Sequence, residues 1–138
     1  MSWDSVDDEF ADAVGEIWAP LRELHGFSGP EFGVSGWTSY PTALFRKGGI
    51  EIRLMCDTRD ESVDCYVRDI TLLDSHSYDI NKPNGWTHLI RWLLENRKKV
   101  LAHGTHKLGL GHTASQEIRH AVEWHFRNLT ESAQELLR

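Results

Sequence analysis

Cysteine is scarce in this chain of 138 residues, which contains only Cys56 and Cys65. A small scaffold held together by several disulfides is therefore excluded, and the length is sufficient to bury a core without such bridges. The two thiols could bridge in an oxidising compartment. In a reducing cytosol we interpret both as small buried hydrophobic residues.

Long apolar runs are also missing. No stretch approaches the roughly 20 residues that a membrane-spanning helix requires, and the first residues, Met-Ser-Trp-Asp-Ser-Val-Asp-Asp, lack the basic and apolar segments of a signal peptide. We therefore expect a cytoplasmic protein with no membrane contact.

Positive charge is almost absent from the first quarter of the chain. Residues 1–35 hold eight acidic residues and a single basic one, Arg22, whereas the remainder carries 13 acidic and 14 basic residues, for a net charge of −6. Such a distribution disfavours nucleic acid as a partner and favours a basic protein.

No motif for nucleotide binding or nucleophilic catalysis occurs. The glycine-rich stretch 104–111 is neither a phosphate-binding loop nor a dinucleotide fingerprint, and no G-x-S-x-G sequence is present. We predict a non-enzymatic protein without a cofactor.

Histidines provide the main alternative, since five of the eight fall between His103 and His125. A metal site needs three or four converging ligands, and no second close pair accompanies His103 and His106. We therefore predict no metal site and interpret His125, on an apolar helical stripe, as a core residue. A small metal-dependent or hydrolytic enzyme using this half of the chain remains the alternative.

Two β-strands are the best-patterned feature of the sequence. Apolar and polar residues alternate over 50–57 and again over 63–68, as in a sheet with one buried face. A turn centred on 60–61 would place Cys56 opposite Cys65. The other face would carry charges of both signs on Glu51, Arg53, Met55, Asp57, Asp64, Tyr66 and Arg68.

After these two strands the apolar residues move from odd-numbered positions, at 63, 65 and 67, to even-numbered ones, at 70 and 72. A β-bulge near Arg68 and Asp69 would return Ile70 and Leu72 to the core face. With a strand at 40–46 in front, these segments predict a three-stranded antiparallel meander.

An amphipathic helix is predicted over 5–25, with a kink at Pro20. Asp8, Asp12 and Glu16 fall four residues apart and form what we call the acidic ridge. Like charges at this spacing cost a few tenths of a kcal/mol per pair, by a rough estimate. The ridge is therefore either a solvated face or a binding surface.

The following segment, 27–41, is rich in Gly, Ser and Pro and predicts a loop that admits a short strand at 34–40. Its aromatic residues either close the core or anchor a partner. They are Phe27, Phe32, Trp37 and Tyr40.

Two further helices are predicted, one over 86–103 with Trp86 facing inward and one from a capping box at 113–116 towards the C-terminus. The fold class is therefore α+β: a three-stranded antiparallel meander with helices packed on one face, in the order α-β-β-β-α-α. Residues 1–138 are expected to form one domain.

This organisation resembles the small acidic immunity proteins encoded beside bacterial polymorphic and contact-dependent toxins. The segment that carries the likeness is 50–67, a strand, a charged Asp-x-Arg-Asp turn and a second strand, between an acidic helix and later helices. The resemblance implies an inhibitor that binds a cognate toxin domain tightly, by occluding or distorting it.

The leading prediction is thus a cytoplasmic immunity protein, a monomer or weak dimer when free, for a basic toxin. The residues expected to bind the toxin are Asp8, Asp12, Glu16, Trp37, Asp57, Asp60 and Asp64. An adaptor or structural subunit of a larger complex is a further alternative, because exposed aromatics can seat a stable partner.

Overall fold

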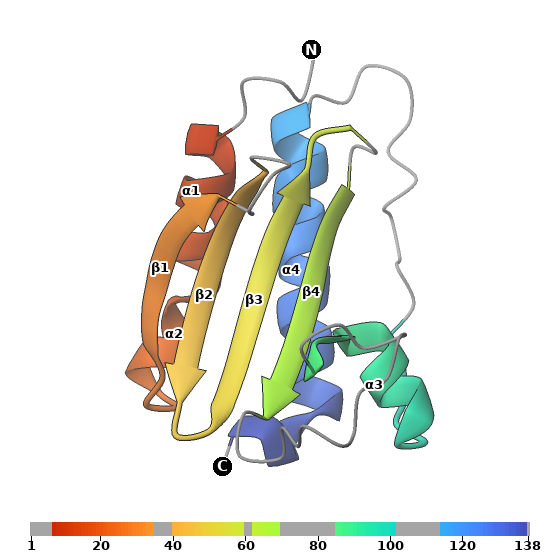
Figure 1. Cartoon of the computed structure of the whole chain (residues 1–138). Helices are drawn as coiled ribbons and strands as arrows, with labels where there is room; N and C mark the ends of the chain where they lie inside the picture. The colour runs from red at the N-terminus through yellow and green to blue at the C-terminus, as the bar shows by residue number, and fades with distance from the viewer. Residues whose placement is uncertain (1–6, 35–39, 60–61, 70–84, 102–113, 138) are drawn as a thin grey trace.

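A computed structural model describes residues 7–34, 40–59, 62–69, 85–101 and 114–137. These residues form an antiparallel sheet with helices packed behind it (Figure 1). In chain order the elements are α1 (Asp7–Ile17), α2 (Ala19–Glu23), β1 (Ser28–Val34), β2 (Pro41–Lys47), β3 (Ile50–Asp57), β4 (Ser62–Asp69), β5 (Thr87–His88), α3 (Leu89–Glu95), α4 (Ala114–Ser132) and the 3₁₀ helix η5 (Gln134–Leu137).

The α+β class is confirmed, but the sheet has five strands in the order β1-β2-β3-β4-β5 rather than three. One added strand, β1, lies in the glycine-rich segment expected to be mostly loop, and at 28–34 rather than 34–40. Glycine and proline are tolerated there because β1 is an edge strand of this sheet. Gly29 is required by geometry, since it has φ 112° and a Cβ would lie 2.5 Å from the Leu44 carbonyl oxygen.

The hairpin of β3 and β4 forms as predicted, but its expected register is wrong by two residues. Cys65 lies opposite Leu54, and Cys56 lies opposite Val63. The turn begins one residue earlier than expected, where the Asp57 carboxylate accepts a hydrogen bond from the Arg59 backbone N–H at 3.0 Å. Because the shift is even, every side chain keeps its predicted face.

The expected bulge near Arg68 and Asp69 is also wrong. Residues 62–69 pair with 50–57 without a shift of register. The register shift of the sheet lies instead in β1, between Ser28 and Glu31. The residues that the bulge was meant to turn inward, Ile70 and Leu72, lie outside the described residues.

The amino-terminal helix is divided at Trp18 into α1 and α2, so that the kink expected at Pro20 is a break. Pro20 occupies the first turn of α2, where its missing N–H costs nothing. Trp18 itself is fully buried, and its indole Nε1 donates to the Val122 carbonyl at 3.1 Å, which ties α1 to α4.

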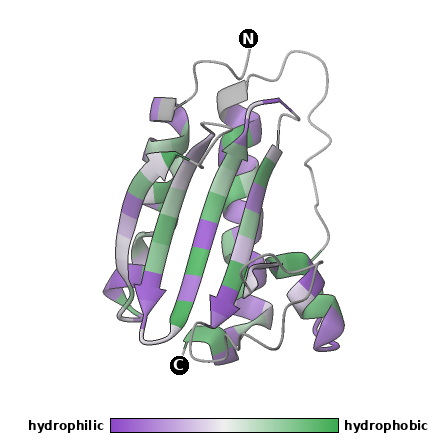
Figure 2. Ribbon diagram, viewed as in Figure 1, coloured by the Kyte–Doolittle hydropathy of each residue, from purple (hydrophilic) through white to green (hydrophobic). Residues whose placement is uncertain are grey.

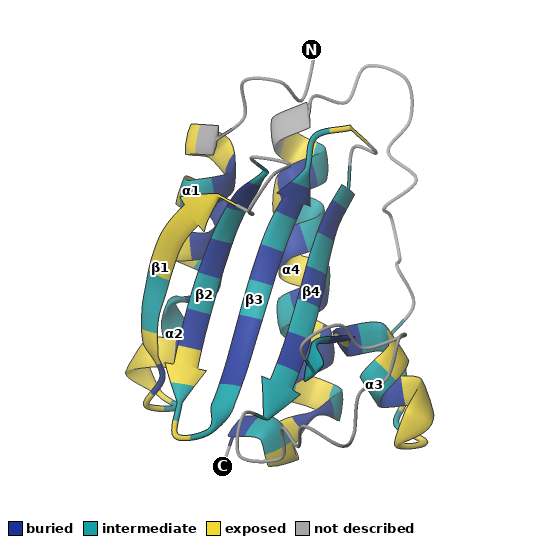
Figure 3. Ribbon diagram, in the orientation of Figure 1, coloured by how far each residue is buried: buried dark blue, intermediate teal, exposed yellow. Residues whose placement is uncertain are grey.

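The core lies between the sheet and the helices. Apolar residues from α1 through η5 form one buried cluster, visible as the green and dark-blue positions that alternate along β2, β3 and β4 (Figures 2 and 3). The largest fully buried side chains include Phe10, Trp18, Phe45, Ile52 and Leu89.

The helix expected over 86–103 is shorter, since α3 spans only 89–95. It ends at Asn96 and at Arg97, whose φ of 56° is left-handed. Trp86 therefore precedes the helix and does not face the core as predicted; it lies over the opposite face of the sheet, on the side chains of Arg53 and Arg68. Among the described residues, we find no helix with the length and apolarity needed to cross a bilayer.

Candidate functional site

The acidic ridge lies on the solvent side of α1. Asp8, Asp12 and Glu16 are all exposed, in agreement with the predicted periodicity. Glu16 is also ion-paired across the helix layer with Arg119 of α4. Asp8 and Asp12 are therefore the more accessible part of this negative surface.

The other predicted binding residues do not join the ridge. Trp37 and Asp60 lie outside the described residues. Asp57 is half-buried at the end of β3 and caps the turn, while Asp64 is half-buried on β4, opposite Met55. Asp64 faces away from α1, so the structure separates the predicted residues into two surfaces.

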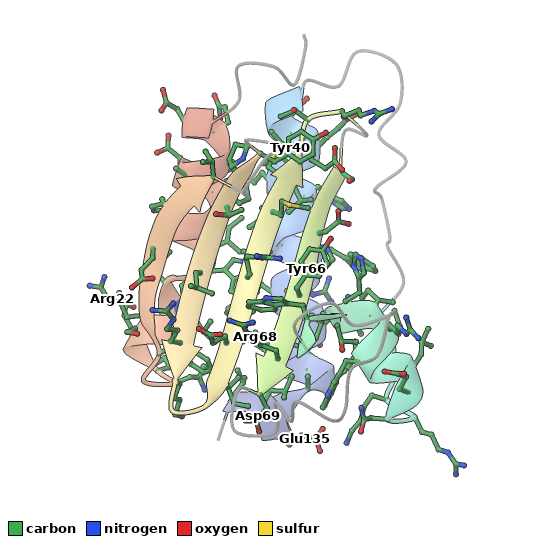
Figure 4. The ribbon with its side chains drawn as sticks, in the orientation of Figure 1. Arg22, Tyr40, Tyr66, Arg68, Asp69 and Glu135 are labelled. Carbon is green, nitrogen blue, oxygen red and sulfur yellow. The ribbon has the colours of Figure 1, made fainter. Side chains whose placement is uncertain are left out.

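The face of the sheet opposite α1 and α4, here called the outer face, carries a more ordered set of side chains. Residues paired across strands share a face, and the pairings of Arg53 with Tyr66 and of Glu51 with Arg68 place all four there. Tyr66 and Arg68 are labelled on the viewer's side of the sheet in Figure 4.

Glu51 is the centre of this set. It is only 4 % exposed, and each of its oxygens accepts a hydrogen bond at 2.6 Å, one from Arg46 Nε and one from Arg68 Nε. Burial opposes its ionisation and is the largest single influence, but the two arginines together outweigh it and hold the pKa of Glu51 below its usual value. Glu31 on β1 adds an outer contact, 3.4 Å from Arg46.

Trp86 forms the aromatic part of the set. The guanidinium carbon of Arg68 lies 4.3 Å from the centre of the Trp86 ring, and that of Arg53 lies 4.6 Å from it. Arg53 also lies 5.4 Å from the Tyr66 ring. These contacts are cation–π interactions, each of which holds a planar cation over an aromatic face.

We call these six residues the arginine–aromatic cluster: Arg46, Glu51, Arg53, Tyr66, Arg68 and Trp86. His88 of β5 extends it, with its ring 4.4 Å from that of Tyr66. Burial raises the pKa of Tyr66 to about 12, with a smaller contribution from the charge of Asp64. Tyr66 is therefore a neutral hydrogen-bonding and stacking group at physiological pH.

Histidine-based chemistry was the main alternative, and only part of that region is described. His125 is buried, as predicted, with Nε2 2.7 Å from the Val63 carbonyl oxygen. Across the described part of the chain no three His, Cys, Asp or Glu side chains are placed to hold a metal ion. His103, His106 and His112 lie outside it.

A small cavity opens between α1, α2 and the sheet. It measures about 130 Å³, and its lining includes Trp18 and Phe45 together with Arg22 and Glu23. Pockets that enclose a drug-sized molecule are typically roughly 300–1,000 Å³. The outer face is therefore the better-organised candidate for recognition.

Comparison of the chain with protein-family models, curated protein sequences and solved structures finds no match.

Sequence reasoning identified the outer face as charged but did not identify the cluster. Alternation placed Glu51, Arg53, Tyr66 and Arg68 on one face, which was the available signal. Trp86 was assigned to the core because it begins an apolar helical pattern. Its position depends on how the chain returns to the sheet, which no local pattern encodes.

Proposed function

We propose that this chain is a cytoplasmic, non-enzymatic protein that binds another protein, and that the partner is a bacterial toxin domain which it neutralises. The observation that carries the proposal is the arginine–aromatic cluster on the outer face. The choice of a toxin as the partner rests in addition on the resemblance to immunity proteins, which lies in a strand, a charged turn and a second strand between helices.

The composition of the cluster supports protein binding. Tryptophan, tyrosine and arginine are the residues most enriched among those that dominate the binding energy of protein interfaces. Trp86, Tyr66, Arg53 and Arg68 lie together and come from three parts of the chain. The cluster thus gathers on one face the residue types that protein interfaces favour.

Preorganisation supports tight binding in particular. Ordering a long side chain on association costs about 0.5–1.5 kcal/mol. Arg68 is already held by Glu51 and by the Trp86 ring, and Arg53 by two rings. Much of this cost is therefore met during folding, as an inhibitor of high affinity requires.

The acidic ridge supports fast capture of a basic partner. Asp8 and Asp12 are exposed on α1, and their field adds to that of the other acids of the amino-terminal region. A surface potential of one sign accelerates association with a partner of the opposite sign, and the acceleration falls with ionic strength. The proposed cytoplasmic location suits two buried cysteines that form no disulfide.

Co-expression tests this function. The first step is to identify the gene next to the one that encodes this chain. If that gene encodes a large secreted protein with a variable C-terminal domain, the domain is produced together with the chain, and bacterial growth and complex formation are measured. Protection from the domain, together with a stoichiometric complex on gel filtration, is the expected result. A toxic domain that the chain neither binds nor neutralises would contradict the proposal.

Variants then test whether the cluster is the surface used. Trp86→Ala is expected to weaken binding to the domain by at least about tenfold, the effect typical of an interface hot spot. Leu94→Ala is the control, since Leu94 is an exposed hydrophobic residue on α3 outside the cluster. Equal affinities for both variants and the unmodified chain would remove the outer face from the interface.

A further inference from the structure

The Trp86 ring is shared by two guanidinium groups. The guanidinium carbons of Arg53 and Arg68 lie 4.6 Å and 4.3 Å from the centre of this ring. Each guanidinium is attracted to the ring, but the two positive charges repel one another. Two cations held this close on one ring need negative charge nearby.

Only one of these two cations has a carboxylate among the described residues. Glu51 is fully engaged, with one oxygen on Arg68 and the other on Arg46, both at 2.6 Å. Arg53 forms no ion pair there, and its Nε is buried without a hydrogen-bond acceptor within the described part of the chain. Such a donor is costly to leave unpaired.

The surroundings of Arg53 do not compensate for this. Burial is the main influence on the pKa of Arg53 and lowers it. Tyr66 raises this pKa, the charge of Arg68 lowers it further, and the charge of Glu51 raises it. Arg53 nevertheless carries its charge at physiological pH, because a guanidinium is not deprotonated in proteins. The outer face therefore holds a fixed cation whose counter-charge is missing from the described residues.

We propose that Arg53 is a carboxylate-binding point, and that its occupant is an aspartate or glutamate side chain of a partner protein, set against the rings of Trp86 and Tyr66. The identity of the occupant as a protein rests on the function proposed above. Because Nε of Arg53 is buried, the carboxylate would meet the terminal Nη donors of this half-buried guanidinium, which match its two oxygens. The flanking rings offer apolar contacts to the aliphatic part of the same side chain.

A carboxylate fits this face better than a nucleic acid. A polyphosphate strand would have to run past Glu31, Glu51 and Asp64, which lie on the same face, and the chain has a net charge of −6. Such a chain repels extended polyanions. A single carboxylate that approaches Arg53 meets the two guanidinium groups over the Trp86 ring and avoids most of this repulsion.

The partner therefore carries two features. It presents an acidic side chain to the outer face, and it is basic where it approaches the acidic ridge. This refines the sequence expectation of a partner that is simply basic.

Peptide titration of the isolated chain tests the site without a known partner. The probes are acetyl-Leu-Glu-Leu-amide and its isosteric control acetyl-Leu-Gln-Leu-amide, with the dinucleotide thymidylyl-thymidine as a phosphate probe. The side-chain N–H signals of Arg53 and Trp86 are followed by ¹H–¹⁵N NMR. The glutamate peptide is expected to shift both signals, with saturation, and the glutamine peptide to shift them far less.

Variants locate the effect. Arg53→Gln should weaken the glutamate peptide by about tenfold, the loss expected for one charge-assisted hydrogen-bonded contact. Arg127→Gln is the matched control, since Arg127 is an exposed arginine on α4 with its own partner, Glu131. If Arg53→Gln proves unfolded, Arg53→Lys keeps the charge but lacks the planar fork, and should weaken binding several-fold.

Three results would overturn the inference: equal shifts with the glutamate and glutamine peptides, equal affinity of Arg53→Gln and Arg127→Gln, or stronger binding of the dinucleotide than of the glutamate peptide at the same signals. The last would indicate a nucleic-acid surface. Failure of this site and failure of the proposed function are separable. A toxin neutralised equally well by Arg53→Gln contradicts only the site, whereas peptide binding without any neutralised toxin contradicts only the function.

Discussion

Glu51 stabilises the outer face by satisfying two arginines from neighbouring strands. Removal of one member of a buried ion pair costs about 3–5 kcal/mol, because the remaining charge stays buried without its partner. The cost should be somewhat smaller here, since Arg46 is half-exposed and retains Glu31.

We therefore expect Glu51→Gln to lower the free energy of unfolding at pH 7 by about 2–3 kcal/mol. Glu31→Gln is the control, since Glu31 also pairs with Arg46 but is exposed, and surface pairs contribute at most about 1 kcal/mol. Urea denaturation followed by circular dichroism measures both. If both variants lowered the free energy of unfolding equally, the burial of Glu51 would contribute nothing to the strength of its ion pairs.

The pH dependence of this contribution has a definite sign. The folded state lowers the pKa of Glu51 from its ordinary value of 4.5, so the stabilisation is complete above that pH and is lost as the pH falls towards the folded pKa. The stability difference between the unmodified chain and Glu51→Gln should therefore shrink below pH 4.5. A difference that stays constant across that range would contradict the ion-pair explanation.

Cys56 and Cys65 are expected to be chemically inert in the native protein. Neither thiol is in a disulfide, and both are buried on the core face; burial raises the pKa of Cys65, which disfavours the reactive thiolate. Ellman's reagent should detect no rapidly reacting thiol in the folded protein and two after denaturation. Rapid reaction of either thiol in the native state would show that the core face of the hairpin is open.

At the scale of elements, α4 holds the segment that follows α3. Asn128 of α4 is fully buried; its Oδ1 accepts from the Leu101 N–H at 2.9 Å, and its Nδ2 donates to the Trp124 carbonyl at 3.1 Å. Trp124 Nε1 in turn donates to the Leu101 carbonyl at 3.0 Å. Side chains thus satisfy both polar groups of the Leu101 backbone.

Asn128→Leu should cost about 2–3 kcal/mol, because it keeps the volume but leaves the Leu101 N–H without an acceptor. Asn96→Leu is the matched control: Asn96 also donates to the carbonyl four residues earlier, at 2.8 Å, but is exposed. Asn96→Leu should lower the free energy of unfolding by no more than about 0.5 kcal/mol, as for other surface positions. Thermal denaturation of both variants compares them, and similar melting temperatures would contradict a special role for Asn128.

The hairpin illustrates which element-level properties local patterns encode. Alternation of apolar and polar residues correctly predicted that Leu54, Cys56, Cys65 and Val67 lie on the core face. Successive side chains of a strand point to opposite faces, so the pattern within one strand is sufficient for this prediction. The register depended on the turn, where the Asp57 side chain captures the Arg59 N–H and moves the centre of the loop. Alternation alone is unchanged by an even shift, so it could not reveal the error.

At the scale of the whole molecule, two surfaces of different character lie on opposite sides. The acidic ridge is on the helix layer, and the arginine–aromatic cluster is on the outer face of the sheet (Figures 1 and 4). If one partner uses both, it must extend around the edge of the domain. The ridge would then affect the rate of encounter more than the lifetime of the complex.

The double variant Asp8→Lys/Asp12→Lys tests this division. Association with the toxin domain should slow at low salt and lose much of its salt dependence, while dissociation changes little. The control is Glu95→Lys/Glu135→Lys, which changes the net charge equally at the α3 and η5 end of the molecule. Stopped-flow measurements over a range of ionic strength compare the two, and equal association rates would exclude steering by the ridge.

The sequence by itself determined the α+β class, the strand–turn–strand unit, the amphipathic first helix with its exposed acids, and the side of the sheet on which each hairpin residue lies. These properties follow from side-chain period and turn chemistry, which act over a few residues. The tertiary structure decided the rest. It determined that β1 joins the sheet, that Glu51 accepts hydrogen bonds from both Arg46 and Arg68, and that Trp86 covers Arg53 and Arg68 instead of entering the core. Each of these arrangements includes segments that are distant in sequence, so it depends on the packing of the whole chain.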